Sequence, residues 1–399
     1  MTRPSATKKA LAAVCLLLAV APADAQTQSG LGPRKRDLRP AAAEGRVAAR
    51  ELPELKCRLH TREPVLDYEF RFYASFWVNI PLRRLHGGGR RLSSTAVIYP
   101  VSVEGSEPIR VEDTYVLGKA VPERMNGQAE LGGAFALGEG RYQVDWTLED
   151  EAGRSCQLSW TLEAKLSRRH RHVNLSVKPG EVAPARTYLF RPEPAVESGG
   201  AGLRVKLLMN LDVPSRRRAR VQLWRYVPMI SGMRMMSRHP ALAEFAVVAF
   251  SLEQQQVLFR RELSKRIWFP ALRNAIASLN PATVELKTLR KGSDLEFLDE
   301  LLAQELNDVE QVDAIIFVGA DDRFGKRITA ETLEQIRAKQ IPVFHFNSTQ
   351  FLWRGAIGNA VRSLGGKEYK VRQPHELAKA VEQLVSDILA QRPRQRSGL

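Results

Sequence analysis

The chain has 399 residues, of which 60 are Lys or Arg and 44 are Asp or Glu, so its formal net charge is +16. Hydrophobic residues make up 44% and charged residues 26%. This is the mix of ordinary globular proteins and excludes a wholly disordered or fibrous chain. After the N-terminal segment, no apolar run approaches the roughly 20 residues that span a bilayer, which excludes a polytopic membrane protein. The length predicts two or three folded units, and the positive charge favours polyanionic neighbours.

Residues 1–25 have the three parts of an export signal. These are a basic segment, an apolar segment and an Ala-x-Ala cleavage signal, at residues 3–9, 11–20 and 23–25. We expect cleavage after Ala25 and an exported protein, periplasmic or secreted, with no transmembrane segment once the signal is removed. The alternative is an N-terminal anchor helix, which needs a longer apolar run than this one.

Export determines how the three cysteines are interpreted. Cys15 leaves with the signal, and Cys57 and Cys156 remain. An even pair in an oxidising compartment predicts one disulfide, Cys57–Cys156. It would close a loop of about 100 residues, for which chain entropy predicts a few kcal/mol of stabilisation. The alternative is two buried free thiols. A metal site is disfavoured because neither cysteine has a C-x-x-C partner.

Residues 26–166 contain two kinds of sequence. Residues 26–50 hold six Arg or Lys and no apolar periodicity, which predicts a disordered basic arm. From 51 to 166, short runs alternate apolar and polar residues between turns, as half-buried strands do. Together these runs predict an antiparallel β-sandwich domain. Its strands are expected at residues 68–78, 95–103, 109–116, 133–137, 140–148 and 156–164.

Residues 203–391 alternate apolar strand-like runs with helix-like stretches. A Pro- and Arg-rich linker at 167–202 precedes them, and a basic tail at 392–399 follows. This alternation predicts an α/β domain with a mostly parallel sheet, covered on both faces, and a binding crevice at the carboxyl ends of the strands. The strands are expected at 203–211, 245–250, 283–289, 314–318, 341–346 and 368–371, and the helices at 270–279, 294–306, 330–339 and 374–389.

The order of these segments resembles a von Willebrand factor A (VWA) domain. The segments that carry the resemblance are Leu208–Asp212, Ala246–Ser251, Lys291–Leu295, Ala314–Asp321 and Ile341–Phe346. The resemblance implies that the second domain is doubly wound, VWA-like and Rossmann-type.

Two further runs are similar to an exported bacterial branch of VWA-related proteins, described especially from Acidobacteria. One is Val248–Phe259. The other is Gly138–Trp146, which matches the G-E-G-R-Y-x-V-x-W motif that this branch often carries in its upstream β domain. The resemblance covers roughly residues 50–390.

The resemblance also implies a metal-ion-dependent adhesion site, but the residues here depart from its pattern. The family binds a hard divalent cation with a D-x-S-x-S loop, a threonine and a later aspartate. After Asp212, Pro214 and Arg216 stand where the two serines would be. Proline offers no side-chain oxygen and arginine repels a cation, so we expect a degenerate site with no metal and no cofactor. The weak alternative is Mg²⁺ held by Asp212, Ser215, Ser293 and Asp321.

The leading hypothesis for function is an exported, non-catalytic protein–protein interaction or adhesion-type module. Its partner would be an unknown protein of the cell envelope or outside the cell, bound through the VWA-like domain without a metal. The contact surface is expected at the strand ends, and its residues are Asp212, Ser215, Arg216, Arg217, Arg218, Ser293 and Asp321.

Two alternatives remain open. The basic runs at 34–36, 168–172, 216–220 and 392–396 favour a charge-driven binder of envelope polyanions, such as lipopolysaccharide or acidic polysaccharide. The second alternative is a hydrolase with an unrecognised site, although the sequence lacks G-x-S-x-G, P-loop and H-E-x-x-H motifs. Nucleic acid is not expected as a partner, because the chain is predicted to be exported and no aromatic ladder accompanies the basic runs.

Overall fold

A computed structural model describes most of the chain from residue 55 onward. The described residues are 38–40, 55–102, 107–118, 121–185, 189–195, 202–212, 223–279, 293–306, 312–321, 328–348 and 355–391. The predicted signal, most of the basic arm and the basic tail lie outside them. The chain divides into two compact units. The first consists of Met1–Val65, Arg71–Ser167 and Leu175–Arg186, and the second of Leu66–Phe70, Arg168–Asn174 and Thr187–Leu399.

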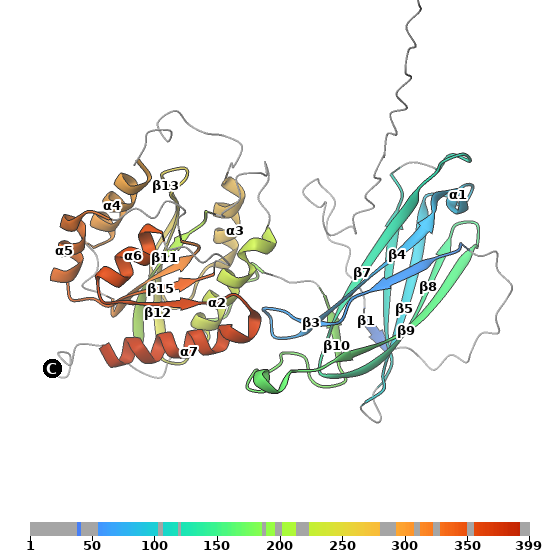
Figure 1. Cartoon of the computed structure of the whole chain (residues 1–399), viewed down its shortest axis with the longest axis horizontal. Coiled ribbons are helices and arrows are strands. Elements are labelled where there is room, and N and C mark those ends of the chain that lie inside the picture. Colours follow the sequence, from blue (N-terminus) through green and yellow to red (C-terminus); the bar gives the residue numbers. More distant parts are fainter. Residues whose placement is uncertain are drawn as a thin grey trace, which may run out of the picture. The chain divides into compact units, whose positions relative to one another are not determined.

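The first unit contains two antiparallel sheets (Figure 1). One has the order β1 (Leu38–Pro40), β6 (Ile109–Val116), β5 (Arg91–Pro100), β8 (Gly140–Asp150) and β9 (Ser155–Ala164). The other has the order β10 (Val182–Pro184), β7 (Gln128–Leu137), β4 (Phe72–Pro81) and β2 (Arg58–Thr61). The short strand β3 (Val65–Leu66) and helix α1 (Leu82–Leu85) precede and follow β4 in the chain.

Alternating side chains form the core between these sheets. In β4, every second residue from Phe72 to Ile80 is buried, and the intervening residues are more exposed. In β8, Tyr142 and Trp146 are fully buried in the same way. The period of two therefore gives each sheet one apolar face and one polar face.

The Gly138–Trp146 motif forms the start of β8. A Cβ on Gly138 would lie 1.8 Å from the carbonyl oxygen of Lys178, so only glycine allows this close approach of two backbones. The Tyr142 hydroxyl donates to the Gly138 carbonyl at 3.0 Å. The motif thus anchors a loop and contributes two large core residues.

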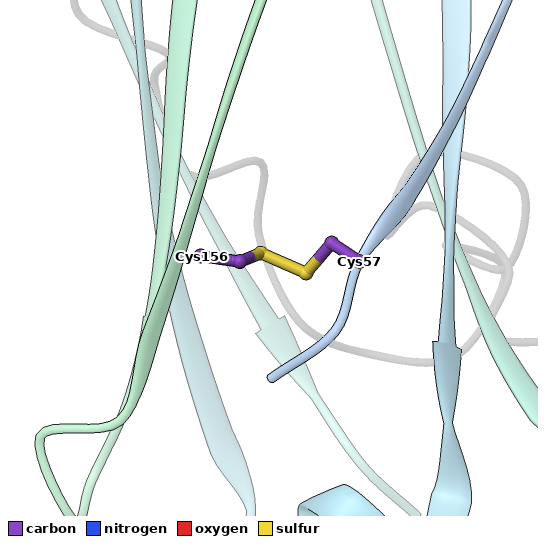
Figure 2. Close-up of a disulfide and its surroundings, with 2 residues drawn as sticks. All are labelled: Cys57 and Cys156. Carbon is purple, nitrogen blue, oxygen red and sulfur yellow. A yellow bond between two sulfur atoms is a disulfide. The ribbon is translucent and has the colours of Figure 1, made fainter. Parts of the chain in front are cut away.

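Cys57 and Cys156 form a disulfide in the first unit (Figure 2). Their Cα atoms are 6.2 Å apart, within the usual range for such a bond. Cys57 directly precedes β2 and Cys156 lies in β9, so the bond joins the two sheets. The disulfide is compatible with an oxidising compartment. Among the described residues, none of the helices has the length and apolar character needed to cross a bilayer.

The second unit contains a mixed six-stranded sheet with the order β13-β12-β11-β14-β15-β16. β11 pairs in parallel with β12 and β14, and the parallel pairing continues to β15 and β16, whereas β13 pairs antiparallel with β12. The strands are β11 (Leu203–Asn210), β12 (Leu242–Ser251), β13 (Gln256–Ser264), β14 (Ala314–Gly319), β15 (Val343–Asn347) and β16 (Lys367–Lys370).

Helices cover both faces of this sheet. One apolar core includes residues of α2 (Val227–Ser237), α3 (Phe269–Ser278) and α7 (Pro374–Gln391). The other includes residues of α4 (Ser293–Leu306), α5 (Ala330–Ala338) and α6 (Ala356–Ser363). Short 3₁₀ helices lie at Arg168–His170 and Leu223–Tyr226.

The fold class predicted from the sequence is wrong. Strands make up 40% and helices 28% of the residues that the structure describes, and two of the three sheets in that part of the chain are antiparallel. The run Val248–Phe259, which supported the resemblance to VWA-related proteins, is a hairpin whose turn residue Gln255 has a φ of 50°. Strand β13 was not predicted, because charged and apolar residues are mixed in Gln256–Ser264. For the chain as a whole, a VWA-like, mostly parallel α/β fold is therefore not indicated, because more of the described residues lie in strands than in helices.

Candidate functional site

Asp212, the first residue of the predicted binding surface, follows β11 and is held by the end of β12. Its Oδ1 accepts a hydrogen bond from the Ser251 hydroxyl at 2.6 Å, and its Oδ2 accepts one from the Glu253 amide at 2.9 Å. Burial raises the pKa of Asp212 to about 6, although both hydrogen bonds lower it. The carboxylate therefore ties two adjacent strand ends together.

Asp321 follows β14 and is buried, with 4% of its surface exposed. Its Oδ2 accepts hydrogen bonds from the amides of Gly355 at 2.8 Å and Gly358 at 3.1 Å, at the start of α6. Asp321 thus caps α6, because it satisfies amides that have no partner within the helix. The two aspartates therefore bind different parts of the fold: Asp212 accepts hydrogen bonds from the end of β12, and Asp321 accepts them from the start of α6.

The other predicted site residues are less completely described. Ser215, Arg216, Arg217 and Arg218 lie outside the described residues. Ser293 begins α4, and its side chain is not among those described. The weak alternative of a Mg²⁺ site formed by Asp212, Ser215, Ser293 and Asp321 therefore remains a prediction.

Asp321 belongs to a buried cluster that was not predicted from the sequence. Its other members are His345 in β15 and Glu368 in β16, which are opposed in register. One ligand atom from each of the three residues lies within 4.8 Å of the others. The histidine stands in the apolar run Val343–Phe346, so in the sequence it reads as a core residue. Only the pairing of two strands 23 positions apart brings it beside Glu368.

The imidazole of His345 is fully buried. Nε2 lies 3.3 Å from the Gly319 carbonyl oxygen, which can only accept, so Nε2 carries the proton. Nδ1 then presents a lone pair, 3.9 Å from Oε1 of Glu368. Burial lowers the pKa of His345 to about 4, although the Glu368 carboxylate raises it.

Glu368 is oriented by two neighbours. Its Oε1 accepts a hydrogen bond from Nδ2 of Asn347 at 2.6 Å, and its Oε2 lies 3.5 Å from the Lys370 ammonium. Burial alone would raise the pKa of Glu368, but the Asn347 hydrogen bond, the Lys370 ammonium and, once it is protonated, the His345 imidazole lower it below its ordinary value. At neutral pH the cluster therefore sets a neutral imidazole against an ionised carboxylate.

A second candidate site lies on the first unit, in a hollow of about 370 Å³ lined by Arg62, Ser75, Trp77 and Glu130. Ser75 and Trp77 occupy the more exposed phase of β4, between the buried residues Ala74, Phe76 and Val78. Glu130 is likewise exposed in β7, between buried neighbours. The hollow thus lies on the face of the sheet that points away from the core.

Trp77 forms the apolar wall of this hollow. His60, opposite Trp77 in the register of β2, stacks on the indole with ring centroids 5.5 Å apart and an interplanar angle of 10°. The guanidinium carbon of Arg62 lies 5.3 Å from the indole centroid. On the other side, the residue of β7 opposite Trp77 is Gly132. A Cβ on Gly132 would meet nothing closer than the Phe76 carbonyl oxygen at 3.9 Å, so the space beside the indole is open.

The hollow combines one aromatic ring with a hydroxyl, a guanidinium and a carboxylate. Such a set suits a small ligand that has both apolar faces and several hydrogen-bonding groups. This site was not predicted from the sequence, because Trp77 stands among the apolar residues of its strand. The alternation of the strand could have revealed it: Trp77 lies between Phe76 and Val78, so its side chain points to the opposite face of the sheet from theirs.

Comparisons with known proteins show weak similarity. No family model matches the chain, and no curated protein matches it. Proximal thread matrix protein 1 from the mussel byssus is similar at 14% identity and a TM-score of 0.28, over 47% of this chain and 45% of the mussel chain. The putative ApaA protein from Bordetella pertussis matches at 14% identity and a TM-score of 0.19, over 29% of this chain and 99% of its own.

A glycosyl hydrolase family 2 member from Bacteroides cellulosilyticus matches at 12% identity and a TM-score of 0.18, over 77% of this chain and 37% of its own. This chain spans less than half of the mussel and glycosyl hydrolase structures. At these TM-scores the similarities carry no argument about function, and they do not indicate a VWA domain.

Proposed function

We propose that the protein is an exported, non-catalytic binding protein and that the hollow around Trp77 binds a saccharide. The observation that carries the proposal is the hollow that Trp77 lines together with Arg62, Ser75 and Glu130, next to Gly132, which has no side chain. Export is supported by the signal-like residues 1–25 and by the Cys57–Cys156 disulfide, a bond typical of oxidising compartments.

A sugar ring has C–H faces that pack on an aromatic ring and a rim of hydroxyl groups that need hydrogen bonds. Trp77 offers an aromatic ring, on one face of which His60 is stacked. The planar groups of Arg62 and Glu130 can donate to and accept from neighbouring hydroxyls. The hollow is a shallow one that opens onto the sheet surface, so it would contact one side of a bound sugar. Its chemistry favours a short saccharide or the end of a longer one.

Binding is favoured over hydrolysis by the composition of the hollow. Most glycoside hydrolases use two carboxylates that flank the bond to be cleaved. Of the described residues that line the hollow, Glu130 is the one with a carboxylate. A hydrolase with an unrecognised site therefore remains the less supported alternative.

The charge of the chain bears on which saccharide is bound. The net charge of +16 and the position of Arg62 favour an acidic polysaccharide, which agrees with the predicted binding of envelope polyanions. Glu130 instead opposes an anionic group placed next to it. A protein partner that binds at the strand ends of the second unit, through the surface containing Asp212 and Asp321, remains a separate hypothesis.

A glycan array that carries both neutral and uronic-acid oligosaccharides tests the proposal. We expect the wild-type chain to bind a restricted set of glycans, Trp77→Ala to lose that set, and Trp224→Ala to keep it. Trp224 is the matched control because it is 66% exposed and lies in the second unit. Absence of binding by the wild type, or equal binding by Trp77→Ala, would contradict the proposal. Binding to every acidic glycan that vanishes at moderate salt would instead support a purely charge-driven function.

A further inference from the structure

We infer that Asp321, His345 and Glu368 form a binding site for a divalent transition-metal ion. The site lies in the second unit and is independent of the proposed saccharide site. One ligand atom from each residue is within 4.8 Å of the other two. His345 is 0% exposed and Asp321 is 4% exposed. A metal ion at their centre would be shielded from bulk water.

The unpaired nitrogen of His345 is the observation that points to a ligand. Among the described residues, none hydrogen-bonds to the buried Nδ1 atom. Because Nε2 donates to the Gly319 carbonyl, Nδ1 carries a lone pair and faces the carboxylate of Glu368 at 3.9 Å. A lone pair opposed to a carboxylate is unfavourable in a buried site unless a cation or a donor lies between them.

Each of the three side chains is also held by a second group of this chain. The Gly319 carbonyl accepts from His345, Asn347 donates to Glu368, and the amides of Gly355 and Gly358 donate to Asp321. Histidines that bind metals almost always donate their other N–H in this way, often to a backbone carbonyl, which fixes the ring and its tautomer. Support of this kind orients all three ligands before a metal binds.

The donor set determines which ions fit. One imidazole nitrogen and two carboxylates suit Zn²⁺, Mn²⁺, Co²⁺ or Fe²⁺, whereas Mg²⁺ and Ca²⁺ prefer oxygen ligands alone. Bonds of about 2.0–2.2 Å place ligand atoms about 3–4 Å apart, so the side chains need to move inward by about an ångström. The protein supplies three ligands and leaves further positions for water.

Lys370 opposes the cation. Its ammonium lies 3.5 Å from Oε2 of Glu368, and 34% of its side chain is exposed, so it can move toward solvent. A metal ion bound to this carboxylate would lie close to the ammonium, and the two positive charges would repel each other. Removal of the charge should therefore tighten metal binding, which a purely structural role of the cluster does not predict.

Titration calorimetry with Zn²⁺ and Mn²⁺ on the full chain, after removal of metals with a chelator, tests the site. The absorption spectrum of a Co²⁺ complex gives a second readout. We expect one ion per chain, at least about 100-fold weaker binding in both His345→Gln and Glu368→Gln, since loss of a direct ligand costs more than loss of an outer-shell partner, and tighter binding in Lys370→Met. His375→Gln is the control, because this histidine stacks on His170 elsewhere in the second unit, and its affinity should equal that of the wild type.

The inference is overturned if the wild-type chain binds none of these ions with at least micromolar affinity. It is also overturned if His345→Gln and Glu368→Gln bind as tightly as the wild type, since the ion then occupies another site. If His345→Gln does not fold, Glu368→Gln and Lys370→Met decide, because an unchanged affinity in both contradicts the site. If a water molecule, and not a metal ion, lies between Nδ1 and the carboxylate, the wild-type chain should bind none of these ions.

Discussion

The ammonium of Lys206 lies 3.0 Å from Oε2 of Glu305, and the two side chains are only 3% and 5% exposed. Lys206 stands in β11 at the centre of the mixed sheet, and Glu305 near the end of α4. Lys206 also donates to the Glu305 carbonyl at 2.9 Å, and Arg260 donates to Oε1 at 2.6 Å. This network fixes α4 on the sheet.

Removal of one partner of this pair should destabilise the second unit strongly. Lys206→Met leaves a buried carboxylate with only Arg260, and Glu305→Leu leaves a buried ammonium, so each should cost about 3–5 kcal/mol. The double variant should cost less than the sum of the two. Urea unfolding of the wild type and the three variants measures the coupling. Additive costs would mean that the two charges do not interact in the folded protein.

The disulfide should contribute a large part of the stability of the first unit. Cys57→Ala/Cys156→Ala removes a bond that closes a separation of 99 residues, for which about 2–5 kcal/mol is typical. Urea unfolding with and without reductant should show this loss in the wild type. The double variant is the control, because reductant should leave it unchanged. Equal stability of the oxidised and reduced wild type would contradict the expectation.

The raised pKa of Asp212 should make the stability of the protein depend on pH. Burial raises its pKa from the ordinary 3.8 to about 6. Between these values the folded state binds more protons at this group than the unfolded state does, so the contribution of Asp212 to stability falls as the pH rises through this window. One pKa unit corresponds to about 1.4 kcal/mol, so the full effect is at most about 3 kcal/mol.

Asp212→Asn isolates this contribution. The free energy of unfolding of the wild type, less that of the variant, should fall by about 1–3 kcal/mol from pH 4 to pH 7. Urea unfolding at a series of pH values measures the difference. If this difference in unfolding free energy stays constant or rises with pH, the pKa of Asp212 is not raised in the folded protein.

Gly138 of the G-E-G-R-Y-x-V-x-W motif should not tolerate a side chain. A Cβ there would lie 1.8 Å from the backbone oxygen of Lys178, so Gly138→Ala should cost about 1–3 kcal/mol through forced backbone movement. Gly118→Ala is the matched control, since a Cβ at Gly118 meets nothing within 4 Å. Thermal unfolding of the two variants compares them, and equal melting temperatures would contradict this role of Gly138.

Helix positions could be predicted well where the apolar period was strong. The expected helices at 294–306, 330–339 and 374–389 correspond to α4 (Ser293–Leu306), α5 (Ala330–Ala338) and α7 (Pro374–Gln391). Thr329 caps α5 by accepting from the Thr332 amide, a signal readable in the sequence. α6 was missed because it is short and contains Gly358, which is a poor helix former.

Strand limits depended on contacts that the sequence does not reveal. The alternation at 68–78 predicted one strand, but Phe70 has a φ of 56° and β4 begins only at Phe72. Tyr68 and Phe70 pack against the core of the second unit, and the Tyr68 hydroxyl donates to the Arg372 carbonyl at 2.9 Å. A contact over 304 positions overrides a local period of two.

The candidate sites were harder to predict than the fold. Asp321 was expected at a strand end, but its partners His345 and Glu368 depend on strand pairing. The role of Trp77 could not be predicted either, because it depends on which face of β4 is buried and on the glycine that lies opposite Trp77 in β7. Residue type alone does not separate a core tryptophan from one that lines an open hollow.

Titration calorimetry with the oligosaccharide that binds best on the array tests the central claim most directly. The wild-type chain and Trp224→Ala should bind it with the same affinity. Trp77→Ala should bind it at least about 30-fold more weakly, since a central aromatic contact contributes about 2 kcal/mol or more. If Trp77→Ala is folded and binds the oligosaccharide as tightly as the wild type does, the saccharide site is not where we place it.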